Sequence, residues 1–339
     1  MDSSQSSPRV LYSPPASKFK RLQLTIKLHL LKFLTKGFFT FLNLPLIRDS
    51  SILPTFTKIY PCQPKLQNRI FVPKSWKSGD ALLPLYIDIH GGGFALMSPV
   101  GDDKFCSYFA NTNKVLVVSL DYPKSPQYKF PAPVGAVVEL VNAVLEDEAL
   151  PFDRKKVAIG GFSAGANLAL AVSQHESLQG RIKGIVPYYP PVDFSTPIEV
   201  SMAWRPKDAG PDLLEKDSAM FNMGYLKPGQ DLKDPLLSVA YASREKLPPK
   251  IYLIGCGHDL LCRDAEILAK RLANVGDSDA SATASDIWEK NSVRWMNVTG
   301  EIHGFDVYPS FGDVKIRREK RRLEMHESVY DWLSREVYT

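Results

Sequence analysis

The stretch KKVAIGGFSAGANLALAV, residues 155–172, decides the fold. Its first half is a β-rich apolar run that ends at two glycines, and its second half has the apolar spacing of a helix. The two halves meet at GFSAG, residues 161–165, which matches the G-x-S-x-G pattern of a sharp strand-to-helix turn. Small flanking residues avoid clashes in this strained turn, and the helix N-terminus favours negative charge beside Ser163. The stretch therefore predicts a strand–turn–helix unit that presents Ser163 as a nucleophile.

The same alternation of strand and helix patterns continues from Leu82 onward. Buried strands are expected at 83–90, 114–122, 155–161, 182–190, 250–257 and 292–300, and helices at 131–150, 164–176 and 262–275. Because strands that alternate with helices build mostly parallel sheets, we expect an α/β fold with helices on both faces of the sheet. Residues 194–248 are expected to form an insertion and 276–286 an exposed loop, and neither stretch looks catalytic.

Composition and charge narrow the function. The chain has 339 residues, enough to bury a large core without disulfides. Residues 1–50 carry a net charge of +6, whereas the whole chain carries +5, so residues 51–339 carry about −1. This nearly neutral main body has no basic surface with which to bind nucleic acid. The four cysteines form no C-x-x-C pair, which argues against a disulfide framework or a redox or metal site. We expect a cytoplasmic protein in a reducing compartment.

The basic N-terminal segment is also apolar. Residues 1–17 are rich in Ser and Pro and are expected to be a disordered tail without a secretory signal. Leu24, Leu28, Leu31 and Leu34/Phe38 then recur at helical spacing, with the lysines largely elsewhere around the helix. The longest uncharged run, Gly37 to Ile47, is 11 residues, and a membrane span needs about 20. We expect this face to pack on the protein's own body, with peripheral membrane contact as the less favoured alternative.

A second glycine-rich turn precedes the serine. His90 and three consecutive glycines end the expected strand 83–90, and no G-K-[ST] follows that would indicate a phosphate-binding loop. Glycines let backbone N–H groups approach a substrate without a side chain in the way, which an oxyanion hole requires. His90 is expected to orient this loop by hydrogen bonding rather than to act as a base.

The serine needs a base that lies later in the chain. The expected order is Ser, then Asp or Glu, then His. His303 lies on a loop after the last expected strand, whereas His326 lies in a final amphipathic helix and is expected at the surface. His258 directly precedes Asp259 and could not donate the orienting hydrogen bond to that residue across the site. His303 is therefore the predicted base.

The acid that orients the base is expected just past a strand end. Asp259 occupies that position, and Asp264, already on the following helix, is the fallback. Glu301 and Asp306 flank the histidine too closely to orient it from behind. The predicted order is thus Ser163, Asp259, His303.

These residues together resemble the hormone-sensitive-lipase-like branch of the α/β-hydrolases, which includes many microbial and fungal esterases. The matching motifs, in order, are HGGGF (90–94), DYPKSPQYKFPAPV (121–134), GFSAG (161–165), YYPPVDF (188–194), DP-x-x-S (234–238), HDLLCRDA (258–265) and HGF (303–305). The resemblance covers residues 80–335. It implies a carboxylic-ester hydrolase of small-molecule esters that needs no cofactor or metal.

The resemblance also assigns roles to individual residues. It implies a catalytic triad of Ser163, Asp259 and His303, with an oxyanion held by the backbone N–H groups of Gly92, Gly93 and Ala164. It further implies a helical cap, formed by N-terminal helices within 18–60 and by the insertion 194–248, over a catalytic domain that spans 61–339.

The sequence departs from the family pattern at two places and leaves two other functions open. Phe162 stands where the family usually has an acidic residue, and the second motif differs from the usual D-Y-R-L-A-P-E-H. One alternative is a tailoring enzyme of secondary metabolism that uses the same fold for product release, acyl transfer or cyclisation. The other is a non-catalytic ligand-binding receptor. Neither the acyl group, the alcohol group nor the oligomeric state follows from the sequence.

Overall fold

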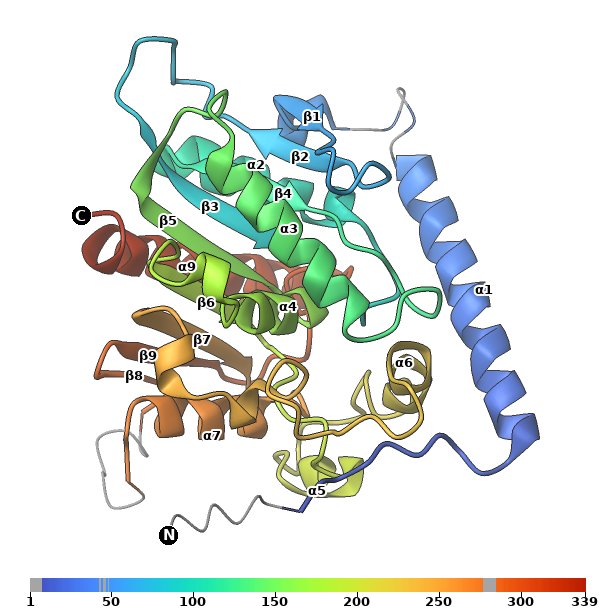
Figure 1. Ribbon diagram of the computed structural model, residues 1–339. Coiled ribbons are helices and arrows are strands. Elements are labelled where there is room, and N and C mark those ends of the chain that lie inside the picture. Colours follow the sequence, from blue (N-terminus) through green and yellow to red (C-terminus); the bar gives the residue numbers. More distant parts are fainter. Residues whose placement is uncertain (1–7, 43, 45–46, 48, 277–284) are drawn as a thin grey trace, which may run out of the picture.

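The computed structural model describes residues 8–42, 44, 47, 49–276 and 285–339. Within these residues nine strands form one sheet in the order β1-β2-β4-β3-β5-β6-β7-β9-β8 (Figure 1). The strands are β1 Phe56–Lys58, β2 Asn68–Phe71, β3 Leu83–Ile89, β4 Leu116–Leu120, β5 Phe152–Phe162, β6 Gly184–Tyr188, β7 Lys250–Cys256, β8 Ile287–Lys290 and β9 Val293–Val298. The six from β4 to β9 in this order are parallel, and β1, β2 and β8 are antiparallel to their neighbours. The predicted mostly parallel sheet is confirmed.

Helices cover both faces of the sheet, as predicted. One apolar cluster joins the sheet to α3 Ala132–Glu146, α4 Ala164–Val172 and α7 Cys262–Leu272. A second cluster on the opposite face joins it to α2 Asp103–Asn113 and α9 Gly312–Glu336. The central strands are buried from both sides, which is why their sequences are continuous apolar runs rather than alternating ones.

The remaining helices lie outside these two layers. They are α1 Lys18–Leu42, α5 Ile198–Ala203 and α6 Ser218–Tyr225, with short 3-10 helices at Ser50–Ile52, Pro99–Asp102, Glu176–Leu178, Val239–Tyr241 and Arg244–Lys246. The α5 and α6 helices fall in the stretch 194–248 that was expected to be an insertion. Figure 1 shows α6 between α1 and the rest of the molecule. No helix in the described ranges is long and apolar enough to cross a membrane.

The N-terminal segment agrees with its prediction in part. Leu24 and Leu28 are buried in a small cluster with Met220 of α6, so this face of α1 packs on the body as expected. Leu34 and Phe38 of the same predicted face are more than half exposed. The predicted disordered tail is wrong at Tyr12, whose N–H donates to the Gln230 carbonyl at 2.8 Å, while residues 1–7 lie outside the described ranges.

Parallel register brings the functional loops to one edge of the sheet. Ile89 of β3 pairs with Gly161 of β5, and Cys256 of β7 pairs with Val298 of β9. The chain segments that follow β3, β5, β7 and β9 therefore leave the sheet at the same edge. These segments contain the glycine loop, Ser163, Asp259 and His303 respectively.

Gly165, at this edge, is closely packed, whereas Gly135 is surrounded by open space. A Cβ on Gly165 would lie 2.0 Å from the Ile89 carbonyl oxygen, whereas a Cβ on Gly135 in α3 would meet nothing within 4 Å. We expect Gly165→Ala to lower the free energy of unfolding by about 3 kcal/mol or more, because the backbone must move to accept the methyl group. Gly135→Ala, the matched control, should raise it by about 0.5–1 kcal/mol. Urea denaturation measures both, and equal stability of the two variants would contradict the packing described.

Candidate active site

Ser163 lies on a strained turn between β5 and α4. Its backbone angles are φ 52° and ψ −116°, a conformation that non-glycine residues rarely adopt. The turn is held by the Ser163 N–H, which donates to the Tyr188 carbonyl at 2.9 Å. A Cβ on Gly161 would lie 2.4 Å from the Ile89 carbonyl oxygen, so only glycine fits there. The structure thus places Ser163 at the N-terminus of α4, as the motif predicts.

Three residues predicted from the sequence form one chain of hydrogen bonds. The Ser163 hydroxyl lies 2.9 Å from His303 Nε2, and His303 Nδ1 lies 2.7 Å from Asp259 Oδ2. Asp259 and His303 are 2 % and 5 % exposed, so bulk water does not compete for these bonds. With Nδ1–H donating to the carboxylate, Nε2 is free to accept the serine proton.

The other candidate acid and base do not take part in this chain of hydrogen bonds. The fallback acid Asp264 makes no bond to His303 and faces Thr196 at 3.4 Å, and burial beside Asp193 raises its pKa to about 6. His326 was expected at the surface, but it is 1 % exposed because α9 packs this side against Phe105 of α2. Burial, reinforced by Arg322, lowers the pKa of His326 to about 3. The predicted exposure of His326 is wrong. The lowered pKa also makes its imidazole a weak base.

The electrostatic surroundings favour the charged form of His303. Burial opposes a charged imidazolium more than any other single effect. The attraction and hydrogen bond of the adjacent Asp259 carboxylate, together with Asp212 and Asp306, outweigh it. The pKa of His303 is therefore raised above its ordinary value. A base with a raised pKa holds a proton more readily at the moment the serine attacks.

The glycine loop after β3 approaches the serine. Gly92 and Gly93 have positive φ values of 107° and 59°. Gly93 and Ala164 line the same cavity as Ser163, whereas Gly92 does not reach its wall. His90 holds the loop from behind, with ring nitrogens 2.7 Å from the Gly91 carbonyl oxygen and 3.2 Å from Asp121 Oδ1. This placement agrees with an orienting role for His90.

The cavity that contains Ser163 is small and partly lined by the insertion. Its volume is about 150 Å³. Its lining includes residues of α5, of α6 and of the segment after β7, namely Ile198, Ser201, Phe221, Asn222, Leu260, Leu261 and Asp264. A cavity of about this volume accommodates a group the size of benzene. Residues 194–248, in which no residue looked catalytic from the sequence, therefore contribute side chains to the lining of this cavity.

The insertion also braces the loop that carries Asp259. The Arg205 guanidinium donates to the His258 carbonyl at 2.8 and 3.1 Å. Asp212 accepts the Leu260 N–H at 2.9 Å and lies 3.4 Å from Arg205, and both side chains are almost fully buried. Two buried charged side chains thus hydrogen-bond to the backbone of the residues on either side of Asp259. No local sequence signal marks this pair, since Arg205 and Asp212 lie in a polar stretch far from the motifs.

A buried carboxylate fixes the loop before His303. Glu301 is fully buried and accepts from Arg317, Arg318 and Arg321 of α9, each at 3.1 Å. Its backbone carbonyl accepts the His258 N–H at 2.9 Å. Glu301 therefore connects α9 to the loop that carries His303 and to the loop that carries Asp259.

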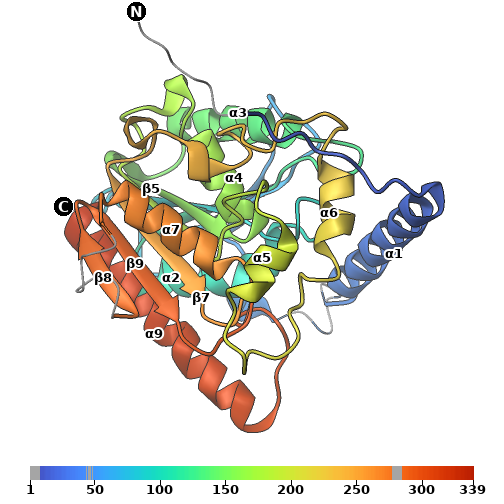
Figure 2. The same cartoon turned by 90° about the horizontal axis from the view of Figure 1, so that it is seen from below.

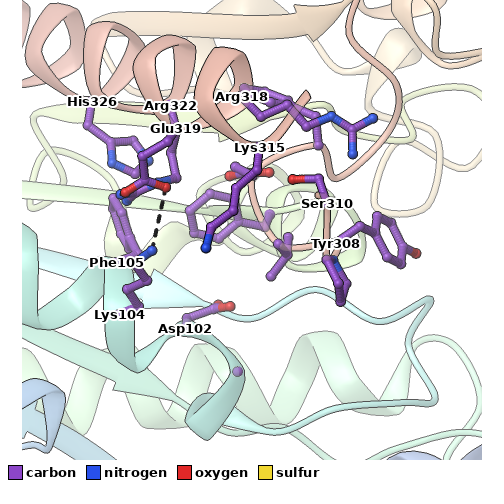
Figure 3. Close-up of a pocket in the computed structure, with 16 residues that line it drawn as sticks. Asp102, Lys104, Phe105, Tyr308, Ser310, Lys315, Arg318, Glu319, Arg322 and His326 are labelled. Carbon is purple, nitrogen blue, oxygen red and sulfur yellow. Dashed lines mark hydrogen bonds and ion pairs between the residues drawn. The ribbon is translucent and has the colours of Figure 1, made fainter. Parts of the chain in front are cut away.

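A second cavity of about 400 Å³ lies behind the nucleophile turn (Figure 3). Phe162 forms part of its wall, and α9 and α2 contribute a charged rim that includes Lys104, bridged to Glu319. Partly buried Asp306, also in the wall, accepts the Tyr189 hydroxyl at 2.8 Å, and the Tyr189 ring packs edge-on against His303. Carboxyl groups thus lie near the site although Phe162 stands where an acid is usual.

Comparison with known proteins agrees with this geometry. A family model described as an alpha/beta hydrolase fold matches residues 86–306. An esterase from Pyrobaculum calidifontis superposes with a TM-score of 0.71 at 23% identity and covers 96% of this chain and 100% of its own, which shows the fold alone. A thermophilic carboxylesterase cloned from a metagenomic library superposes with a TM-score of 0.63 at 26% identity, over 79% of this chain and 85% of its own.

Curated relatives are similarly distant. The rat neutral cholesterol ester hydrolase 1 is 26% identical over 59% of this chain, and the arylesterase of Saccharolobus solfataricus is 28% identical over 65% of it. The matches span 65% and 68% of these two proteins, and 61% of a related alpha/beta hydrolase from Acanthamoeba polyphaga mimivirus. The family match and the motifs together show that this chain belongs to the alpha/beta hydrolase fold family, in its hormone-sensitive-lipase-like branch.

Proposed function

We propose that the protein hydrolyses a carboxylic ester through an acyl-enzyme, with Ser163 as nucleophile. The observation that carries this proposal is the uninterrupted chain of hydrogen bonds from Ser163 through His303 to Asp259. Membership of the family and the esterases among the relatives support the same chemistry. The reaction uses no group beyond this chain and water.

Each step can be assigned to an atom. His303 Nε2 takes the Ser163 proton as Oγ attacks the ester carbonyl carbon, and Asp259 stabilises the imidazolium that forms. The oxyanion accepts from the backbone N–H groups of Gly93 and Ala164, with Gly92 as the third donor that the family resemblance implies. His303 then gives its proton to the leaving alcohol. A water molecule, deprotonated by the same nitrogen, attacks the acyl carbon, and His303 returns that proton to Ser163 Oγ as the ester bond to the serine breaks and the acid leaves.

We further propose that residues 18–60 and 194–248 form a cap over the catalytic domain, 61–339. Phe221 of α6 supports this role because its ring lies against Gly93, where an added Cβ would be 2.5 Å from it. A location in the cytoplasm is supported by the four cysteines, which are all unpaired within the described chain.

The first test is a series of p-nitrophenyl esters from acetate to palmitate. Because the cavity beside Ser163 is about 150 Å³, we expect the highest kcat/KM with acyl chains of two to about four carbons. Ser163→Ala should lower kcat by at least about 10⁴-fold, while the exposed Ser177→Ala should leave it unchanged. Absence of turnover by the folded wild type would contradict the proposal and favour a tailoring enzyme or a receptor.

The pH dependence of kcat/KM tests the electrostatics of His303. Only the neutral imidazole can take the serine proton, so activity should rise with pH, with a midpoint above 6.5 because the pKa of His303 is raised. Asp212→Asn removes a negative charge that raises this pKa, and the midpoint should move to lower pH. The exposed Asp208→Asn is the control and should leave the midpoint in place. An identical midpoint for wild type and Asp212→Asn would refute this account.

Removing the Arg205 guanidinium tests the brace on the acid loop. We expect Arg205→Met to lower kcat/KM about tenfold, because the loop holding Asp259 loses two hydrogen bonds. It should also lower the free energy of unfolding by about 3 kcal/mol, since Asp212 is left buried without its partner. Arg263→Met, at a half-exposed arginine on α7, is the matched control. Full activity in a folded Arg205→Met enzyme would show that the brace does not position Asp259.

A further inference from the structure

The α1 helix presents a long apolar stripe to solvent. Figure 2 shows α1 at the outer side of the molecule, where α6 is its main neighbour. Large apolar side chains on α1, each at least 53 % exposed, are Phe19, Leu22, Ile26, Leu30, Phe33, Leu34, Phe38 and Phe41. Most of them recur every three or four residues, so they share one face of the helix. A contiguous apolar surface of this kind marks an interaction site.

The stripe is not the face with which α1 packs on the protein. Leu24 and Leu28 point the other way, into the cluster with Met220 of α6. Lys27 is paired with Asp217, and Lys32 donates to the Ser125 carbonyl and, at 3.1 Å, to Gln127. These contacts fix the rotation of α1 about its axis. The stripe is therefore held outward by Leu24, Leu28 and Lys32 on the other side of the helix, and by Lys27 at the edge of the stripe.

The charges of α1 decide what the stripe meets. The helix contains six Lys or Arg residues and no Asp or Glu. At about 100° per residue, Lys18 and Lys36 border the stripe on one side and Lys20 borders it on the other. Apolar side chains with flanking cations suit the boundary between acyl chains and anionic lipid headgroups, where lysine stems extend toward the headgroups. A second copy of this chain would instead place two wholly basic helices together.

We propose that α1 docks this protein on the surface of membranes that contain anionic lipids, with the stripe from Phe19 to Phe41 inserted among the acyl chains. The helix would lie in the plane of the interface, since no described helix is apolar enough to span a bilayer. This binding does not depend on the proposed catalysis.

Vesicle co-sedimentation of the full chain tests the proposal. The probes are vesicles of phosphatidylcholine with phosphatidylserine and vesicles of phosphatidylcholine alone. The test variant is Ile26→Gln/Leu30→Gln/Phe33→Gln, which polarises the centre of the stripe. The matched control is Leu82→Gln/Ile267→Gln/Ile287→Gln, three exposed apolar residues away from α1. Circular dichroism and turnover of p-nitrophenyl acetate show whether each variant is folded, and both variants should match the wild type in these measurements.

We expect the wild type and the control to sediment with anionic vesicles, and the stripe variant to lose at least tenfold in partition coefficient. Lys18→Glu/Lys36→Glu should weaken binding to anionic vesicles selectively, as should high salt. A wild type that stays in the supernatant with both vesicles would overturn the proposal, as would a stripe variant that binds like the wild type. Dimerisation that the stripe variant abolishes, without vesicle binding, would assign the stripe to a second copy of the chain.

Discussion

The packing of Gly161 and Gly165 against the end of β3 is the constraint on which the site depends. An added Cβ on either residue would overlap the Ile89 carbonyl oxygen, so α4 begins as close to the sheet as a backbone can. This proximity forces the turn at Ser163 into a positive φ and projects the side chain above the edge of the sheet. The free energy of the buried sheet and its two helix layers keeps this strained conformation in place.

Around that turn, the other groups are positioned by a few buried polar contacts. The loops after β7 and β9 carry Asp259 and His303, and the bond from the His258 N–H to the Glu301 carbonyl ties them together. Arginines from α9 hold this pair of loops on one side, and Arg205 of the insertion holds it on the other. Charged groups on elements far apart in sequence thus maintain a geometry that catalysis needs to within about half an ångström.

Much of the fold and the core of the site could be predicted because their signals are local. Buried strands are apolar runs, and GFSAG specifies a turn by the size of its residues. His303 and Asp259 were found by their positions after strands, and parallel register brings such positions together. Arg205 and Asp212 could not be found in this way, because their pairing exists only once the insertion has folded over the β7 loop. His326 lies in a strongly basic helix whose composition conceals the face that packs on α2.

The central claim is that strand register brings His303 to Ser163 and so makes Ser163 the nucleophile. Covalent trapping tests this claim most directly. The full chain is treated with an organophosphate that has a p-nitrophenolate leaving group, and the modified peptide is located by mass spectrometry. Attack by a serine activated by His303 should give one phosphoryl adduct on the peptide that contains Ser163, and His303→Ala should prevent its formation. An adduct on another residue, or one that forms equally fast without His303, would contradict the account.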